Sequence, residues 1–214
     1  MDQHVGGTDG KTKNPPIAIP NVKELHDFEF LDDGLLARKL SGVGNGKLID
    51  FNENYKTTNL EFELPEEYGS IRTICQVRSS DQLIVGTTDN CLVAGTFLSG
   101  MEGILSHGHD DEVLKLVALN ESQFLSLSQD KWIRIWELNA HQVIWSYKTD
   151  DVSYACCISN DGSLLLVGFQ DGCCIIVDIE SKCIIDEFTV LTDCITDMQF
   201  SPNGCILAVV TKAG

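Results

Sequence analysis

The sequence has 214 residues and a mass of 23.6 kDa, which suits one domain with a substantial core. It is strongly acidic, because 15 lysines and arginines face 32 aspartates and glutamates and leave a net charge of −17. This balance argues against nucleic acid or an anionic membrane as a direct partner, since both are bound through a basic surface. No apolar run approaches the roughly 20 residues of a membrane-spanning helix.

The N-terminal segment and the cysteines indicate a cytoplasmic protein. The first ten residues, MDQHVGGTDG, contain neither the basic region nor the apolar region of a secretory signal peptide. Nine cysteines in 214 residues fall well below the roughly 8–10% of disulfide-stabilised scaffolds. We therefore expect free thiols in a reducing compartment.

Residues 1–22 contain three of the five prolines, several glycines and almost no apolar periodicity. Such a composition buries too little apolar surface to offset the entropy of ordering, so we predict a disordered N-terminal arm.

From residue 23 onward, short runs of β-branched, aromatic and other apolar residues alternate with turn sequences. The runs include LIVG at 83–86, WIRIW at 132–136, SLLLVGF at 163–169, CCIIVDI at 173–179 and CILAVV at 205–210. The turn sequences between runs include DDG at 32–34, SSDQ at 79–82, NDG at 160–162, QDG at 170–172 and PNG at 202–204. Runs of this composition form strands, and Asp-Gly and Asn-Gly pairs favour tight hairpins. The chain is therefore predicted to be all-β.

The spacing of the turns reveals a repeat. Equivalent turns contain Asn45, Asp89, Asp130 and Asp171, at intervals of 44, 41 and 41 residues. The position six residues after each is occupied by Phe51, Gly95, Trp136 and Val177. A period of about 40–45 residues with four short strands per unit is typical of a β-propeller.

We therefore predict a segment of a β-propeller with about three and a half to four blades, each a four-stranded antiparallel sheet. The expected units are 23–64, 65–106, 107–148, 149–190 and an incomplete unit 191–214. A seven-bladed ring would need roughly 290 residues at this period, so we expect an incomplete ring.

Five stretches carry a resemblance to a known family: LPEEYGSIRTI at 64–74, LIVGTTDNCLVAGT at 83–96, HGHDDEVLKL at 107–116, FLSLSQDKWIRIW at 124–136 and SNDGSLLLVGFQDG at 159–172. The chain resembles WD-repeat proteins, and specifically the echinoderm microtubule-associated protein-like family, from about residue 26 to residue 210. Many members carry two fused propellers, a coiled coil and a basic region. Because this sequence has neither a heptad segment nor a basic region, we expect a partial or truncated member.

The same resemblance assigns four residues of the third unit to a structural tetrad: His109, Ser128, Asp130 and Trp136. In WD repeats these side chains hydrogen-bond to one another inside one blade. Because Ser, His and Asp occur together, a hydrolase triad is the alternative interpretation. A triad also needs an exposed nucleophile and an oxyanion hole, and the structural role is favoured.

Two other motifs resemble ligand-binding sites, but their sequences argue against a phosphate-binding loop and a zinc site. The segment GVGNGK at 42–47 lacks the first Gly and the Ser or Thr of a phosphate-binding loop and continues into a strand, LIDF. The pairs Cys156-Cys157 and Cys173-Cys174 place neighbouring thiols on opposite faces of a strand and lack the spacing of a zinc site. One thiol of each pair is expected between blades, and no cofactor or metal is predicted.

A candidate partner-binding rim is drawn from loops at one end of the predicted blades. Loops on rigid scaffolds commonly contact partners, although acidic loops are also ordinary solvated surface. The rim consists of Asp89, Asp110, Asp111, Glu112, Gln129, Lys131 and Gln170.

The sequence favours a non-catalytic protein-interaction scaffold, and the resemblance implies binding to tubulin or microtubules in the cytoplasmic cytoskeleton. Two alternatives stay open: a WD-repeat adaptor in another complex, and a thiol- or metal-dependent enzyme built on the cysteines. Exposed blade edges would also favour self-association. Because the microtubule lattice is acidic, a chain of charge −17 is expected to bind it weakly.

Overall fold

The computed structural model describes residues 25–30, 35–40, 45–50, 57–77, 82–96, 100–106, 108–190 and 192–213, with side chains described within the part from Leu64 onward. The N-terminal arm predicted for residues 1–22 lies outside the described residues, as does Phe51 of the repeat pattern. No helix in the described part of the chain has the length and apolarity needed to cross a membrane.

The described strands form four four-stranded antiparallel sheets and one two-stranded sheet, which confirms the all-β prediction. The first sheet contains β1 (Leu25–Phe30), β2 (Leu35–Leu40), β3 (Asn45–Asp50) and β4 (Thr57–Glu63). After a short 3-10 helix, η1 (Glu66–Tyr68), the second contains β5 (Ile71–Gln76), β6 (Gln82–Thr87), β7 (Leu92–Thr96) and β8 (Gly100–Ser106).

The remaining sheets repeat this up-and-down order. The third contains β9 (Val113–Ala118), β10 (Gln123–Ser128), β11 (Trp132–Glu137) and β12 (Gln142–Lys148). The fourth contains β13 (Ser153–Ile158), β14 (Leu164–Phe169), β15 (Cys173–Asp178) and β16 (Cys183–Thr189). The last contains β17 (Ile195–Phe200) and β18 (Leu207–Thr211).

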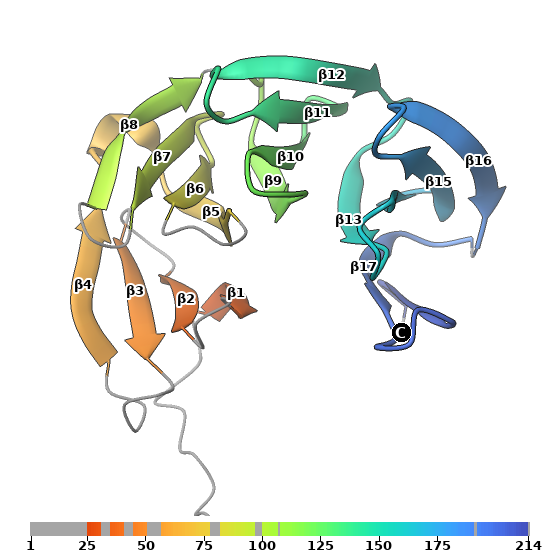
Figure 1. The fold of residues 1–214 in the computed structure, drawn as a ribbon, viewed down its shortest axis with the longest axis horizontal. Coiled ribbons are helices and arrows are strands. Elements are labelled where there is room, and N and C mark those ends of the chain that lie inside the picture. Colours follow the sequence, from red (N-terminus) through yellow and green to blue (C-terminus); the bar gives the residue numbers. More distant parts are fainter. Residues whose placement is uncertain are drawn as a thin grey trace, which may run out of the picture.

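Successive sheets follow one another around an open arc, with the first strand of each sheet on the inner side (Figure 1). Neighbouring inner strands are in contact, β5 with β9 and β13 with β17. The described sheets form an unclosed propeller.

The core lies between the sheets, because the second strands of the second, third and fourth sheets, β6, β10 and β14, are buried on both faces. Cys75, Ile84 and Leu92 of the second sheet pack with Val113 and Trp136 of the third. By contrast, every residue of the outermost strand β16 is exposed. Burial thus decreases from the second strand of a sheet to its outermost strand, which explains why the second strands have near-continuous apolar sequences.

The paired cysteines follow the two-sided burial of β13. Cys156 packs in the cluster between the third and fourth sheets, whereas Cys157 packs in the cluster toward β17. Both thiols of this pair are therefore buried between sheets, where only one was expected. The reason is that β13 has a neighbouring sheet on each face.

Aspartates organise the turns between the second and third strands. The carboxylate of Asp130 accepts a hydrogen bond from the backbone N–H of Trp132 at 2.9 Å, and that of Asp171 accepts one from Cys173 at 3.0 Å. Lys131 and Gly172 complete these turns with positive φ of 65° and 84°. An aspartate side chain that bonds the backbone two residues on stabilises a tight turn, which explains the regular spacing of these residues.

Candidate functional site

A chain of hydrogen bonds links four buried or partly buried side chains inside the third sheet. The indole Nε1 of Trp136 donates to Ser126 Oγ at 2.8 Å. Ser126 Oγ lies 2.6 Å from His109 Nε2, and His109 Nδ1 lies 2.9 Å from Asp130 Oδ2. The network connects the loop before β9 to β10, β11 and the turn between them.

The prediction that Ser128 is the serine of this network is wrong. Ser126 and Ser128 are two residues apart on β10, so the sequence places both on one face of the strand. Ser128 lies at the end of β10, where its hydroxyl donates to the backbone oxygen of Asp111 at 3.1 Å and accepts from the backbone N–H of Asp130 at 3.1 Å. Ser126 lies one step deeper in the sheet, within reach of Trp136.

The chemistry of the partners favours one protonation state of the network. The indole N–H can only donate, so Ser126 Oγ accepts from Trp136. The ionised Asp130 carboxylate can only accept, so His109 donates to it from Nδ1, and the neutral ring then accepts the Ser126 hydroxyl hydrogen at Nε2. Burial lowers the pKa of His109 below its ordinary value, which agrees with this neutral form.

Asp130 provides the negative end of the network. Burial alone would raise the pKa of its carboxyl group, but hydrogen bonds from His109, the backbone N–H of Asp110 and Arg134 hold that pKa well below its ordinary range. Arg134 forms an ion pair with Asp130 at 3.0 Å and also contacts His109 Nδ1. The carboxylate is thus ionised at neutral pH and fully engaged.

This arrangement does not provide a nucleophile. The Ser126 side chain is completely buried and bonded on both sides, whereas acyl transfer needs a hydroxyl that a substrate can reach. The buried thiols are equally unsuited, because burial raises the pKa of Cys156 and Cys157 to about 12. No group of three or more metal-binding side chains occurs among the described residues.

The structure brings most of the predicted rim residues together at the turn beside Asp130. The backbone N–H of Gln129 donates to the oxygen of Glu112 at 2.9 Å, so the loop at 110–112 lies against the turn at 129–131. Asp110, Asp111, Gln129 and Lys131 are exposed, and Lys131 Nζ donates to the backbone oxygen of Asp150 at 2.8 Å.

The other two rim residues lie on neighbouring sheets. Asp89 is exposed in the turn between β6 and β7, where its carboxylate accepts a hydrogen bond from Thr88 at 3.1 Å. Gln170 is exposed after β14. The partner-binding role of the rim remains a prediction.

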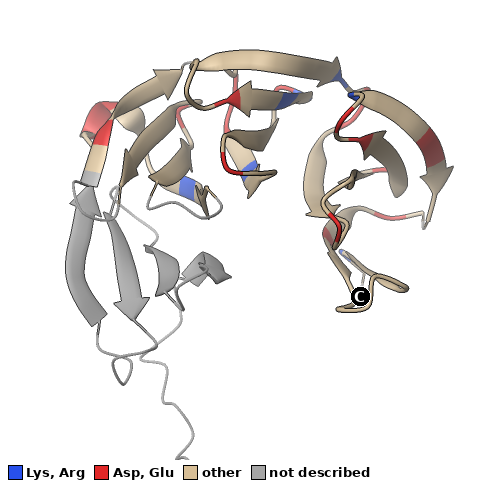
Figure 2. Ribbon diagram, viewed as in Figure 1, with Lys and Arg blue, Asp and Glu red and all other residues tan. Residues whose placement is uncertain are grey.

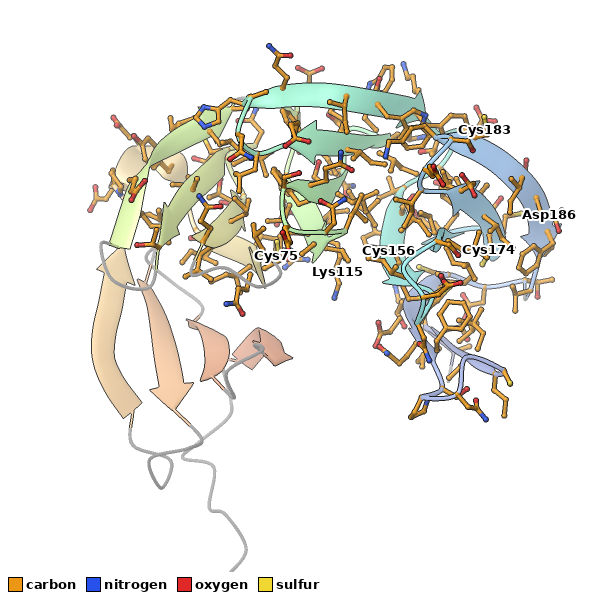
Figure 3. The ribbon with its side chains drawn as sticks, viewed as in Figure 1. Cys75, Lys115, Cys156, Cys174, Cys183 and Asp186 are labelled. Carbon is orange, nitrogen blue, oxygen red and sulfur yellow. The ribbon has the colours of Figure 1, made fainter. Side chains whose placement is uncertain are left out.

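A cavity of about 680 Å³ lies beside the inner strands and was not predicted from the sequence. It is lined by Arg72, Leu114, Lys115, Tyr154, Gln170, Asp193, Cys194, Thr196 and Lys212. Figure 2 shows basic positions on β5 and β9 along the inner side of the arc, and Figure 3 labels Lys115 there. Gln170 is the rim residue that also lines this cavity.

A sequence signal for this cavity did exist. Arg72, Leu114, Tyr154 and Thr196 are each the second residue of an inner strand. An alignment of the inner strands would have placed them at one level around the arc, although only the three-dimensional arrangement shows that Lys212 joins them.

Comparisons with known proteins agree on a WD40 β-propeller fold. A family profile described as the anaphase-promoting complex subunit 4 WD40 domain matches residues 112–203. A crystal structure of the WD40 β-propeller domain of Doa1 superimposes with a TM-score of 0.74 at 15% identity, covering 87% of this chain and 60% of that chain. At this identity the likeness establishes the fold alone.

Relatives at higher identity share one name. The chain is 33% identical to human echinoderm microtubule-associated protein-like 1 over 182 residues, which cover 84% of this chain and 22% of that protein. It is 32% identical to the rat echinoderm microtubule-associated protein-like 2, covering 84% of this chain and 27% of that protein. The human echinoderm microtubule-associated protein-like 4 is 27% identical over 94% of this chain and 21% of its own length. The chain thus spans about a quarter or less of these relatives.

Proposed function

Because this chain belongs to the echinoderm microtubule-associated protein-like family of WD-repeat proteins, we propose that it is a non-catalytic scaffold that binds tubulin or microtubules. The observation that carries the proposal is the match to relatives named for microtubule association, which extends over 84% of the chain. A cytoplasmic location on the microtubule cytoskeleton follows from the same proposal.

The third sheet offers a suitable binding surface. The loop at 110–112 and the turn at 129–131 are exposed, yet the hydrogen bonds of Asp130 and Ser128 hold their backbones. A preorganised surface loses little conformational entropy when a partner binds. The network around Ser126 therefore supports binding by keeping these loops in place.

The net charge bears on the form of the partner. A chain of charge −17 is repelled by an acidic lattice, and the repulsion is strongest at low salt. We therefore expect weak binding to assembled microtubules and a contact with unassembled tubulin through a local patch.

Substitution of Lys131 tests whether the rim contacts tubulin. Lys131→Glu adds repulsion at the rim, whereas Lys148→Glu makes the same charge change on the outer strand β12. We expect Lys131→Glu to weaken binding to immobilised tubulin by roughly tenfold, and Lys148→Glu by less than about twofold. Equal effects of the two variants would assign the binding to net charge and would remove the rim from the proposal.

A second candidate is an adaptor in a different complex. The match of residues 112–203 to a WD40 domain of an anaphase-promoting complex subunit favours it. The two candidates share the scaffold and differ only in the partner, so absence of any tubulin binding by an otherwise folded chain would favour the adaptor.

A further inference from the structure

We propose that the cavity beside the inner strands binds an acidic peptide segment of a protein partner. This inference rests on the proposed scaffold function and specifies the chemistry of one partner segment. The cavity has about 680 Å³, within the range of roughly 300–1,000 Å³ typical of ligand sites.

Four β-bulges build the wall of the cavity. The pairing of four inner strands, β5, β9, β13 and β17, skips one residue. In β5, Ile71 and Thr73 pair with Thr87 and Gly86, so Arg72 is the extra residue. The same shift makes Leu114, Tyr154 and Thr196 the extra residues of β9, β13 and β17. All four bulged residues line the cavity. Bulges re-aim side chains out of the regular ladder and are common beside functional sites.

The charge of the cavity is opposite to that of the molecule. Among the described residues, Arg72, Lys115 and Lys212 line it with Asp193 as the single carboxylate, whereas the whole chain has 15 basic and 32 acidic residues. The Asp193 carboxylate accepts hydrogen bonds from the backbone N–H groups of Cys194 at 2.8 Å and Ala213 at 2.7 Å. A concave basic site on an acidic protein concentrates an anionic ligand in one place.

Arg72, in the wall of the cavity, already binds a carboxylate. Arg72 Nε lies 3.1 Å from Glu112 Oε1, and the Arg72 side chain is 39% exposed. A guanidinium group has five N–H donors, so one contact through Nε does not exhaust it. Glu112 therefore acts as an internal competitor for the glutamate or aspartate of a ligand.

The lining favours a peptide over a small phosphate. The three cations come from β5, from β9 and from the residue after β18, so they lie along the wall on separate sheets. Between them, Leu114 and Tyr154 offer apolar contacts, while Gln170 and Thr196 offer partners for a peptide backbone. A chain of spaced carboxylates matches this distribution better than one compact anion.

Fluorescence anisotropy with a labelled twelve-residue peptide rich in glutamate tests the proposal on the full chain. A peptide with glutamine at each glutamate position is the control ligand. We expect Lys115→Gln and Lys212→Gln each to raise the dissociation constant roughly fivefold, and Lys148→Gln on β12 to change it by less than about twofold. Glu112→Gln is expected to tighten binding about twofold to threefold, because it removes the competitor.

Three results would overturn the proposal: no binding of the glutamate peptide, equal weakening by Lys148→Gln, or binding of tripolyphosphate to the same lysines without binding of the peptide. Near-UV circular dichroism checks that each variant is folded, and Lys212, which is exposed, provides a second variant if Lys115→Gln fails to fold. Sedimentation with tubulin separates the two claims. A chain that binds tubulin but not the peptide refutes only this inference, and one that binds the peptide but not tubulin refutes only the tubulin assignment.

Discussion

At the scale of single residues, Ser126 is the centre of the most consequential polar network in the described part of the chain. It bonds both Trp136 and His109, and all three side chains are buried. Removal of its hydroxyl leaves two buried groups without a partner, and buried unsatisfied polar groups are costly. Ser128 is also buried, but its partners are backbone groups of Asp111 and Asp130 rather than buried side chains.

Serine-to-alanine variants should therefore separate the two positions. We expect Ser126→Ala to lower the free energy of unfolding by about 2 kcal/mol, and Ser128→Ala by about 1 kcal/mol or less. Urea denaturation followed by tryptophan fluorescence measures both values. A larger loss of unfolding free energy for Ser128→Ala than for Ser126→Ala would show that Ser128, not Ser126, is the central serine of the network.

The neutral state of His109 predicts a pH dependence of stability. Its pKa is lowered in the folded chain, so below about pH 6.5 the unfolded chain binds a proton that the folded chain does not. Stability is then lost as the pH falls. Between pH 7.5 and 5.5 the loss from this residue is at most about 1.4 kcal/mol.

Urea denaturation of the wild type and His109→Gln at both pH values tests this. The variant should lose less stability between the two pH values than the wild type does. The pKa of Asp130 is also lowered, so its contribution is lost only below the ordinary aspartate pKa, outside this window. An equal pH dependence of the two proteins would contradict a neutral, buried His109.

At the scale of elements, close approach between sheets depends on glycines in the second strands. A Cβ atom built on Gly168 of β14 would lie 2.7 Å from Ile195 Cγ2 and 3.1 Å from Ile195 Cβ. Gly86 occupies the equivalent place in β6 and faces Val113 in the same way, at 2.6 Å from Cγ1. These glycines let the inner strand of the next sheet pack directly against the backbone.

Gly168→Ala should therefore destabilise the contact between the fourth and fifth sheets. We expect a loss of about 1–3 kcal/mol in the free energy of unfolding, the usual cost of overpacking. Combination with Ile195→Ala should give less than the sum of the two single losses, because the clashing methyl group is then absent. Strict additivity in this double-mutant cycle would show that the steric contact is not the cause.

Features that depend on residues close together in the sequence could be predicted, whereas features that depend on distant residues could not. Strand runs and turn aspartates are local, so the all-β class, the repeat and the turns at Asp130 and Asp171 were predictable. The choice between Ser126 and Ser128 was not, because both lie on one strand face and only the reach of Trp136 decides. The cavity was missed because its lining residues form a set only when the inner strands are aligned with one another, and because Lys212 comes from a distant segment.

At the scale of the whole molecule, the open arc leaves an uncovered sheet. Among the described residues β18 pairs only with β17, and Val210 on β18 is 51% exposed. Exposed apolar edge strands recruit further strands, so we expect this chain to self-associate in isolation.

A charged residue on the edge should reverse that association. Val210→Lys should shift the weight-average mass toward that of a monomer, as measured by sedimentation equilibrium. Val143→Lys makes the same change on β12, at a side chain that is 41% exposed, and should have a smaller effect. A wild-type chain that is monomeric at all concentrations would contradict this expectation.

The central claim, that this acidic propeller segment is a tubulin-binding scaffold, is tested most directly by sedimentation velocity of the purified chain with unassembled tubulin. The boundary of the chain should move to a heavier species when tubulin is added, and the shift should persist at about 150 mM salt, where long-range repulsion is screened. An unchanged boundary for a folded chain, at tubulin concentrations up to tens of micromolar, would contradict the tubulin assignment.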